Sequence, residues 1–303
     1  MWVPFYIYSQ WRAAESGGMR RGRLKPGDAL PGTFGGKDMI KLVVSDIDGT
    51  LVGDGQGEGA LNPAYYDVIR RLGARGVKFM ACSGRQRLSI AKLFRPIERE
   101  IFYACDGGSM VYQHDRLLYA RTFPRETAEG LMRDAAEIEK CDFMVCGTEH
   151  AYCRWEDSEL YRWMTEGYGY DIRALGSELA HRISEDIVKV SIYHHDHAEE
   201  LTAPWFRPRW KDKVKLTLAG IQWLDCVPQD AGKGAAVAFM QRHFGISPSE
   251  TIVFGDNQND MEMFSLAGKS YAVENARDEV KRAASHECES YERDGVLKIL
   301  SDL

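Results

Sequence analysis

Short apolar runs alternate with amphipathic segments along the first third of the chain. Ile40 to Ser45 is a β-branched apolar run, which is typical of a parallel strand buried on both faces. A helical pattern follows from Asn62 to Leu72, and Val77 to Ala81 and Ile101 to Ala104 are again short apolar runs. This alternation predicts a βαβαβ unit, which winds right-handed into a parallel sheet.

The pattern changes near Ser109. Met110 to Phe123 reads as a hairpin that turns about His114 and Asp115. The stretch that follows has candidate strands at Phe143 to Gly147, Ala151 to Trp155, Ile187 to His194 and Val214 to Leu218, and candidate helices near Glu126 to Lys140 and Ser158 to Thr165. This mixed order of elements predicts a separate α+β domain.

The first pattern resumes after Leu224 to Val227. It continues with a helix from Lys233 to Phe244, a strand at Thr251 to Phe254, a helix from Asn259, a strand at Ser270 to Val273 and a last helix from Asp294. We therefore predict an α/β fold, in which a doubly wound, Rossmann-like parallel sheet is built from residues 39–110 and 226–303. An α+β cap domain, residues 111–225, interrupts it.

The first 38 residues differ in composition from the rest. They are aromatic at the start, then basic, then rich in Gly and Pro, and this order does not match a signal peptide. We expect residues 1–38 to be a disordered or non-native extension, with Met39 beginning the folded unit.

Composition narrows the class of protein. Of the 303 residues 44% are apolar and 28% are charged, as in an ordinary globular protein, and the formal charge of -6 argues against a nucleic-acid partner. The seven cysteines include no C-x-x-C pair, so we expect reduced thiols in the cytoplasm. Because no apolar run approaches the ~20 residues that cross a bilayer, we expect no membrane span. A small anionic substrate is compatible with this charge.

Two carboxylates follow the first predicted strand, in the run Asp46-Ile47-Asp48-Gly49-Thr50. Residues two apart in an extended chain face the same side, so both carboxylates point together at the edge where open α/β sheets bind ligands. Such a pair suits metal binding combined with acid/base chemistry, while the Gly-Thr turn can present N–H groups to an anion. By itself this run is also compatible with a simple turn or a calcium-loop fragment.

Ser83-Gly84-Arg85 follows the second predicted strand and reaches the same edge. The serine hydroxyl can donate to a phosphate oxygen, although a serine before a helix is also a common N-cap. Arg85 can hold a substrate anion through two hydrogen bonds or remain solvated.

Two later features add charge to this edge. Lys233 is the first residue of a predicted helix, where the helix dipole disfavours a cation. Another requirement therefore explains its position, and neutralisation of a bound phosphate is the leading candidate. A solvated surface lysine is the alternative. Asp256 and Asp260 flank the loop after the strand Thr251 to Phe254, and Asn259 lies in the same loop. These carboxylates can approach a hard cation, whereas the alternative is an ordinary capped loop.

Together these groups resemble the haloacid dehalogenase superfamily, and within it the Cof-type phosphatases that carry a large α/β cap. The resemblance rests on D-I-D-G-T-L from Asp46, S-G-R from Ser83, the lone Lys233 after the insert, and G-D-N-Q-N-D from Gly255. The sequence departs from the family at Asp106, where an asparagine is common, and at Tyr291.

The resemblance implies roles for these residues. Asp46 is the expected nucleophile, and Asp48 the expected general acid and base. The expected Mg²⁺ site consists of Asp46, the main-chain carbonyl of Asp48, and Asp256, with Asp260 nearby. The expected phosphate-binding residues are Gly49, Thr50, Ser83, Gly84, Arg85 and Asn259, together with Lys233. The implied substrate is a small phosphorylated metabolite, with a sugar phosphate as the leading candidate.

Two other activities use a similar set of residues. A signalling receiver also carries an acceptor aspartate and a lysine, but it has no insert and no second catalytic carboxylate. A phosphomutase of the same superfamily would return the phosphoryl group to a substrate instead of releasing it to water. Asp48 and the large insert favour turnover over the receiver, and the product, inorganic phosphate or an isomerised sugar phosphate, separates the phosphatase from the phosphomutase.

Overall fold

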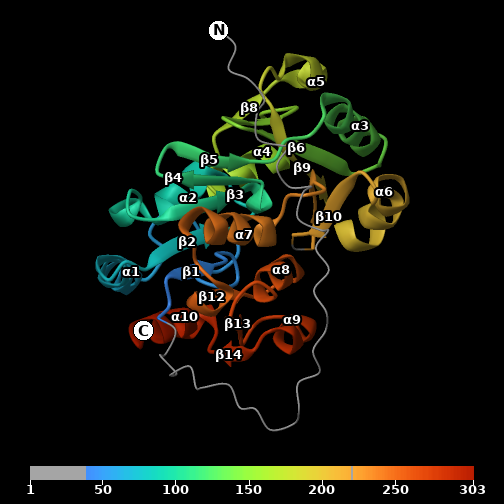
Figure 1. Cartoon of the computed structure of the whole chain (residues 1–303). Helices are drawn as coiled ribbons and strands as arrows, with labels where there is room; N and C mark the ends of the chain where they lie inside the picture. Colours follow the sequence, from blue (N-terminus) through green and yellow to red (C-terminus); the bar gives the residue numbers. More distant parts are fainter. Residues whose placement is uncertain (1–38, 220) are drawn as a thin grey trace, which may run out of the picture. The chain divides into compact units, whose positions relative to one another are not determined.

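The computed structural model describes residues 39–219 and 221–303, so the expectation for residues 1–38 lies outside the described residues. The described residues form fourteen strands in two sheets (Figure 1). The strands are β1 (Leu42–Ser45), β2 (Lys78–Cys82), β3 (Phe102–Cys105), β4 (Met110–Gln113), β5 (Arg116–Ala120), β6 (Cys141–Gly147), β7 (Ala151–Cys153), β8 (Ile172–Ala174), β9 (Ile187–His194), β10 (Val214–Leu218), β11 (Trp223–Pro228), β12 (Thr251–Gly255), β13 (Lys269–Val273) and β14 (His286–Cys288). The α-helices are α1 (Ala64–Ala74), α2 (Arg87–Leu93), α3 (Arg125–Ala136), α4 (Glu159–Arg162), α5 (Leu179–Arg182), α6 (Ala203–Trp210), α7 (Lys233–Phe244), α8 (Met261–Phe264), α9 (Asp278–Ala283) and α10 (Gly295–Ser301).

The first sheet has the order β14-β13-β12-β1-β2-β3-β4-β5 and is parallel from β14 to β3. All four residues of β1 are buried, because helices cover both faces of the sheet. Right-handed crossovers run one way from β1 to β3 and the other way from β12 to β14, which places α1 and α2 on one face and α8 and α9 on the other. The fold is therefore the predicted doubly wound α/β fold, and its strand order reverses between β1 and β12.

The hairpin β4–β5 belongs to this first sheet, although the sequence led us to place it in the insert. β4 pairs antiparallel with β3, from Phe102 opposite Gln113 to Cys105 opposite Met110. Of the four residues between the strands, the first three, Asp106 to Gly108, have positive φ angles and reverse the chain immediately. A reversal this tight keeps β4 beside the strand that precedes it.

The second sheet has the order β10-β11-β9-β6-β7-β8 and is antiparallel except for the pair β7–β8. Helices α3 and α6 pack against its strands. The core was expected to resume at residue 226, but Leu224 to Val227 belongs to β11, which pairs with β9 and β10. The chain returns to the first sheet only after Pro228, because β11 pairs antiparallel with both β10 and β9 and so completes the antiparallel ladder.

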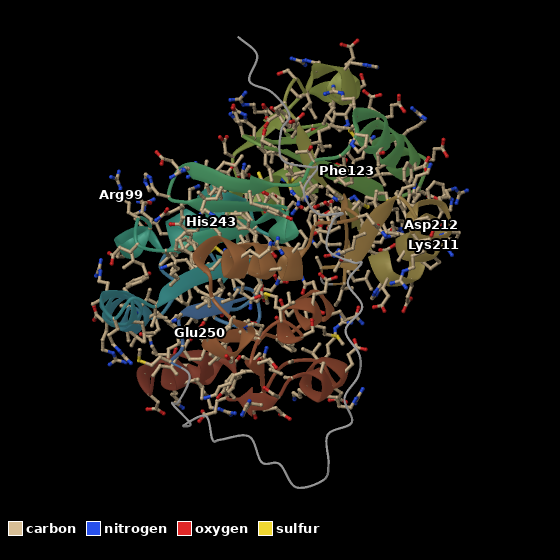
Figure 2. All side chains as sticks on the ribbon, in the orientation of Figure 1. Arg99, Phe123, Lys211, Asp212, His243 and Glu250 are labelled. Atoms are coloured by element: carbon tan, nitrogen blue, oxygen red, sulfur yellow. The ribbon has the colours of Figure 1, made fainter. Side chains whose placement is uncertain are left out.

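Apolar side chains fill the space between elements, and charged side chains cover the outside (Figure 2). Within residues 39–219 and 221–303, no helix is both long enough and apolar enough to cross a lipid bilayer.

Candidate active site

The site lies where the strand order of the first sheet reverses. Asp46 directly follows β1, and its N–H donates to the carbonyl oxygen of Phe254 in β12 at 3.0 Å. Ile47 is fully buried, while Asp46 and Asp48 both line a cavity. The predicted alternation is thus observed, and the two carboxylates lie at the carboxyl edge of the sheet.

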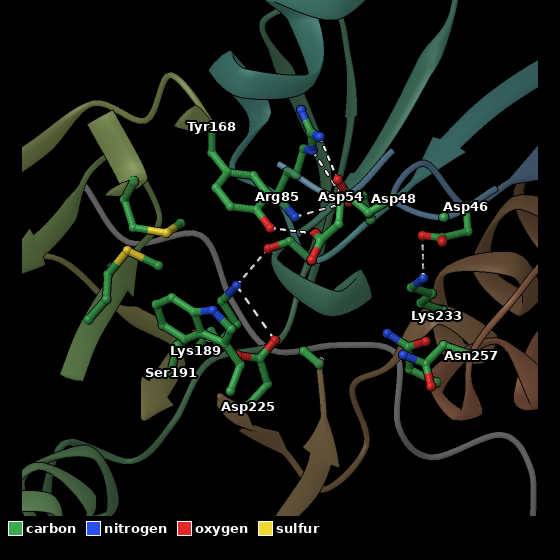
Figure 3. Close-up of a pocket in the computed structure, with 18 of the residues that line it drawn as sticks. Asp46, Asp48, Asp54, Arg85, Tyr168, Lys189, Ser191, Asp225, Lys233 and Asn257 are labelled. Atoms are coloured by element: carbon green, nitrogen blue, oxygen red, sulfur yellow. Dashed lines mark hydrogen bonds and ion pairs between the residues drawn. The ribbon is translucent and has the colours of Figure 1, made fainter. Parts of the chain in front are cut away.

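One cavity of about 280 Å³ brings together the five side chains that the sequence placed in a common pocket (Figure 3). They are Asp46, Asp48, Ser83, Lys233 and Asp256. They come from segments that follow β1, β2, β11 and β12. The volume suits a small molecule.

Lys233, the first residue of α7, lies between two carboxylates. Its Nζ is 2.5 Å from Asp46 Oδ1 and 2.6 Å from Asp260 Oδ1, and its side chain is 2% exposed. Burial alone would lower the pKa of Lys233, but Asp260 and Asp46 raise it well above its usual value. The lysine therefore stays charged, which explains a cation at a helix start.

Asp260 organises this part of the site. Its Oδ1 accepts from Lys233, and its Oδ2 accepts from the main-chain N–H groups of Asp256 and Asn257, both at 3.0 Å. Both oxygens are thus engaged within the protein. Asp260 holds the loop after β12 and the lysine in fixed positions, and it has little capacity left to bind a ligand.

Asp46 and Asp256 form a carboxylate pair linked by Thr50. The Thr50 hydroxyl lies 3.1 Å from Asp256 Oδ1 and 3.3 Å from Asp46 Oδ2. Burial and the nearby carboxylate of Asp260 raise the pKa of Asp256 to about 6, and burial raises the pKa of Asp46 despite the opposing effect of Lys233. Ligand oxygens of Asp46, Asp256 and Asp260 lie within 4.8 Å of one another. This crowding of carboxylates fits a divalent cation, which prefers oxygen ligands.

Gly49 permits the close approach of this loop. Its φ is +80°, and a Cβ atom there would lie 2.5 Å from Asp256 Oδ2. Only glycine fits without displacing the carboxylate.

Arg85 pairs with Asp48. Its Nε and Nη2 donate to the two oxygens of Asp48 at 2.8 and 2.5 Å, and Nη2 also donates to the carbonyl oxygen of Gln56. Ser83 Oγ lies 3.3 Å from Asp48 Oδ2. The ring of Tyr168 lies over the guanidinium, 5.0 Å from Cζ to the ring centroid. The arginine therefore orients the second carboxylate, and its predicted contact with a substrate anion stays a prediction.

The remaining predicted residues divide into two groups. Gly49, Ser83, Gly84, Arg85 and Asn259 line the cavity. The buried Oδ1 of Asn259 has no hydrogen-bond partner among the described residues. Thr50 is fully buried behind the carboxylates and supports them instead.

The sequence did not predict the wall of the cavity that lies away from Asp46. The wall is contributed mainly by the second sheet and by the segment before β8: Met144, Met164, Tyr168, Tyr170, Lys189, Ser191, Trp223 and Asp225. Lys189 and Asp225 stand inside otherwise apolar strand sequences, and a charge in such a run is the signal that could have identified them.

Most of the chain matches one family of known proteins. Residues 43–300 match the haloacid dehalogenase-like hydrolases. The chain belongs to this family. The resemblance predicted from the motifs is thereby confirmed.

Relatives and solved structures extend the comparison. The Escherichia coli K12 protein YbjI, named 5-amino-6-(5-phospho-D-ribitylamino)uracil phosphatase, is 23% identical over 86% of this chain and 95% of its own length. The HMP-PP phosphatase of Cronobacter sakazakii is 25% identical over 82% and 89% of the two chains. A solved structure from Eubacterium rectale is 37% identical, covers 87% of this chain and 99% of its own, and superimposes with a TM-score of 0.78. The subclass IIB sugar phosphatase BT4131, 20% identical over 86% and 98% of the two chains, has the same fold with a TM-score of 0.74.

Proposed function

We propose that this member of the family is a Mg²⁺-dependent phosphatase that hydrolyses a small phosphorylated metabolite through an aspartyl-phosphate on Asp46. One observation carries the proposal. Asp46 lies at the switch point of the sheet, paired with the buried Lys233, and a second carboxylate, Asp48, lines the same cavity two residues later. The names of the relatives, which are phosphatases of small metabolites, support the same reading.

The first step is an attack of the Asp46 carboxylate on the substrate phosphorus. The bond from phosphorus to the leaving oxygen breaks, and Asp48 donates a proton to that oxygen. In the second step Asp48 removes a proton from a water molecule, which attacks the same phosphorus and frees Asp46. Lys233, fixed by Asp260, neutralises charge on the phosphoryl group throughout.

The carboxylates fit a divalent cation, which we assign as Mg²⁺. Asp46, Asp256 and the main-chain carbonyl of Asp48 would hold it, since both oxygens of Asp260 are engaged with Lys233 and the loop. When bound, the cation supplies further charge neutralisation for the phosphoryl group. The boundaries of the inserted cap are also part of the proposal: by sheet membership it extends to Pro228, and its inner face covers the site.

A screen of phosphorylated metabolites, with and without Mg²⁺, tests the proposal by release of inorganic phosphate. We expect Mg²⁺-dependent release from the wild-type protein, and a loss of at least 10³-fold in Asp46→Asn, since removing a nucleophile removes the covalent route. Asp212→Asn, an exposed substitution between α6 and β10, is the matched control and keeps full activity (Figure 2). Equal phosphate release by Asp46→Asn refutes the nucleophile, and an isomerised product without phosphate release indicates a phosphomutase.

A further inference from the structure

Alternate residues of neighbouring strands build the wall of the cavity that lies away from Asp46. Lys189 and Ser191 come from β9, and Trp223 and Asp225 come from β11. Successive side chains of a strand point to opposite faces, so a spacing of two places these four on one face of the second sheet. Figure 3 shows Lys189, Ser191 and Asp225 together, on the opposite side of the view from Asp46 and Lys233.

Among the described residues of this wall, no cationic side chain is unpaired. Lys189 Nζ donates to the carbonyl oxygen of Gly84 at 2.6 Å and lies 3.5 Å from Asp106 Oδ1 and 3.8 Å from Asp225 Oδ2. Lys189 and Asp106 are almost completely buried, with side-chain exposures of 2% and 1%. Neither carboxylate oxygen of Asp106 has a hydrogen-bond partner among the described residues. One ammonium group therefore serves two carboxylates.

The rest of the cavity likewise offers no unpaired lysine or arginine among its described residues. Among the described residues that line it, the lysine and arginine side chains are Arg85, Lys189 and Lys233, and each is already paired with a carboxylate. Burial raises the pKa of Asp106, and Lys189 opposes this rise. Even if Asp106 holds a proton, Asp225 still balances the lysine, so the wall carries no net positive charge.

Asp225 retains capacity to accept hydrogen bonds. Its Oδ1 accepts from Ser191 Oγ at 2.6 Å, and its Oδ2 lies 3.7 Å from the position of a Cβ built on Gly84. Asp225 therefore faces the loop expected to bind the phosphate. A carboxylate has about four lone-pair directions, so donors on a bound molecule can still reach it. Met144 and Trp223 beside it offer apolar surface for a carbon skeleton.

We propose that Asp225 selects phosphomonoesters whose leaving group carries hydroxyl or amino donors, and rejects those with a second anionic group. This inference rests on the proposed function, and it narrows the substrate to neutral or cationic polyhydroxy compounds. A second phosphate or a carboxylate at this wall would meet Asp225 with no unpaired cation beside it, and like charges at a binding surface disfavour the complex. An amine or a hydroxyl would donate to Asp225.

Three probes of similar size test the selection: glucosamine 6-phosphate, glucose 6-phosphate and 6-phosphogluconate. For the wild-type protein we expect kcat/KM to be at least tenfold higher for the first two than for the carboxylate. Asp225→Asn keeps the shape but removes the charge, so the preference for glucosamine 6-phosphate over 6-phosphogluconate should fall at least tenfold. The control Asp212→Asn should leave this ratio unchanged. Equal or inverted preference in the wild-type protein overturns the inference.

A binding measurement separates this inference from the proposed function. Calorimetric titration of Asp46→Asn with the same probes in Mg²⁺ gives dissociation constants without turnover. Weaker binding of 6-phosphogluconate than of the other two, at least tenfold, supports the selection even if the nucleophile has been assigned wrongly. Equal binding of all three overturns the selection, whereas phosphate release by the wild-type protein from the other screened metabolites would leave the proposed function intact.

Discussion

Gly108 offers a sharp test of how the site is held together. Its φ is +84°, and a Cβ atom there would lie 2.4 Å from the carbonyl oxygen of Gly232 and 2.7 Å from the main-chain nitrogen of Lys233. Both contacts are with main chain, which cannot rotate away. The turn after β3 therefore sets the position of the first turn of α7, and so of Lys233, which we propose neutralises the phosphoryl group. Gly108→Ala should displace Lys233 from Asp46.

Gly76 provides the matched control. Its φ of +86° is nearly the same, but nothing lies within 4 Å of a Cβ built there. Gly76→Ala should cost only the left-handed conformation, about 1–2 kcal/mol of unfolding free energy. Gly108→Ala should cost that amount plus about 1–3 kcal/mol for overpacking, or about 2–5 kcal/mol in all. The difference in unfolding free energy between Gly108→Ala and Gly76→Ala therefore measures the cost of the contact with α7.

Urea denaturation and steady-state phosphatase kinetics measure the two consequences. We expect kcat/KM of Gly108→Ala to fall at least tenfold, because a shift of about 1 Å in a catalytic group can reduce the rate a hundredfold. Gly76→Ala should keep the wild-type kcat/KM. If the unfolding free energies of the two variants differ by less than about 0.5 kcal/mol and their kcat/KM values are equal, the turn does not position Lys233.

Two further substitutions probe other parts of the structure. Arg85→Lys keeps the charge but loses the two-point contact with Asp48, so kcat measured by steady-state kinetics should fall roughly tenfold or more. The control Arg99→Lys, at an exposed position, should leave kcat unchanged. An unchanged kcat for Arg85→Lys contradicts the orienting role of Arg85. Burial alone would raise the pKa of Glu185, but hydrogen bonds from Tyr152 and its other neighbours lower it. A lowered folded-state pKa means that the stabilisation is present near pH 7 and is lost as the pH falls through that pKa. Glu185→Gln should therefore lower the unfolding free energy by about 1–3 kcal/mol at pH 7 and by less near pH 3, as measured by urea denaturation, and an equal loss at both pH values contradicts the argument.

The elements with strong local signals were predicted well. β9 and α7 have the bounds that the sequence indicated, Ile187–His194 and Lys233–Phe244. A long β-branched run defines the first, and a glycine on each side defines the second. α6 was not predicted, because Pro204 and Pro208 lie within its eight residues and proline normally argues against a helix.

Sheet membership was the harder problem, because it depends on contacts between distant segments. The hairpin β4–β5 and the strand β11 were both predicted at nearly the observed positions, but the hairpin was placed in the insert and the boundary of the core was placed inside β11. Strand propensity does not depend on which partner a strand will have. Only the tight turn at Asp106 to Gly108 and the ladder from β10 to β9 decide the pairing.

The sequence predicted one end of the cavity but not the other, for a similar reason. Asp46, Asp48, Ser83 and Asp256 lie in loops at strand ends and Lys233 begins α7, so the topology alone brings them together. Lys189 and Asp225 lie inside strands, and their meeting depends on the register between β9 and β11, in which Asp225 stands opposite Ser191. A shift of one residue would turn Asp225 to the other face, so the sequence could not establish this contact.

Under the proposed function, the distribution of charge accounts for a need for both a cation and a single phosphate. Near β1, the carboxylates of Asp46, Asp256 and Asp260 surround one ammonium group, that of Lys233, so an added divalent cation brings the cluster close to neutrality. At the opposite wall, Lys189 is already balanced by its own carboxylates. Among the described residues that line the cavity, the proposed cation would therefore add positive charge only beside Asp46, so we expect a substrate with one phosphoryl group to bind there in one orientation, with its uncharged part against the second sheet. The same arrangement that neutralises the transferred group therefore also orients the leaving group toward the cap.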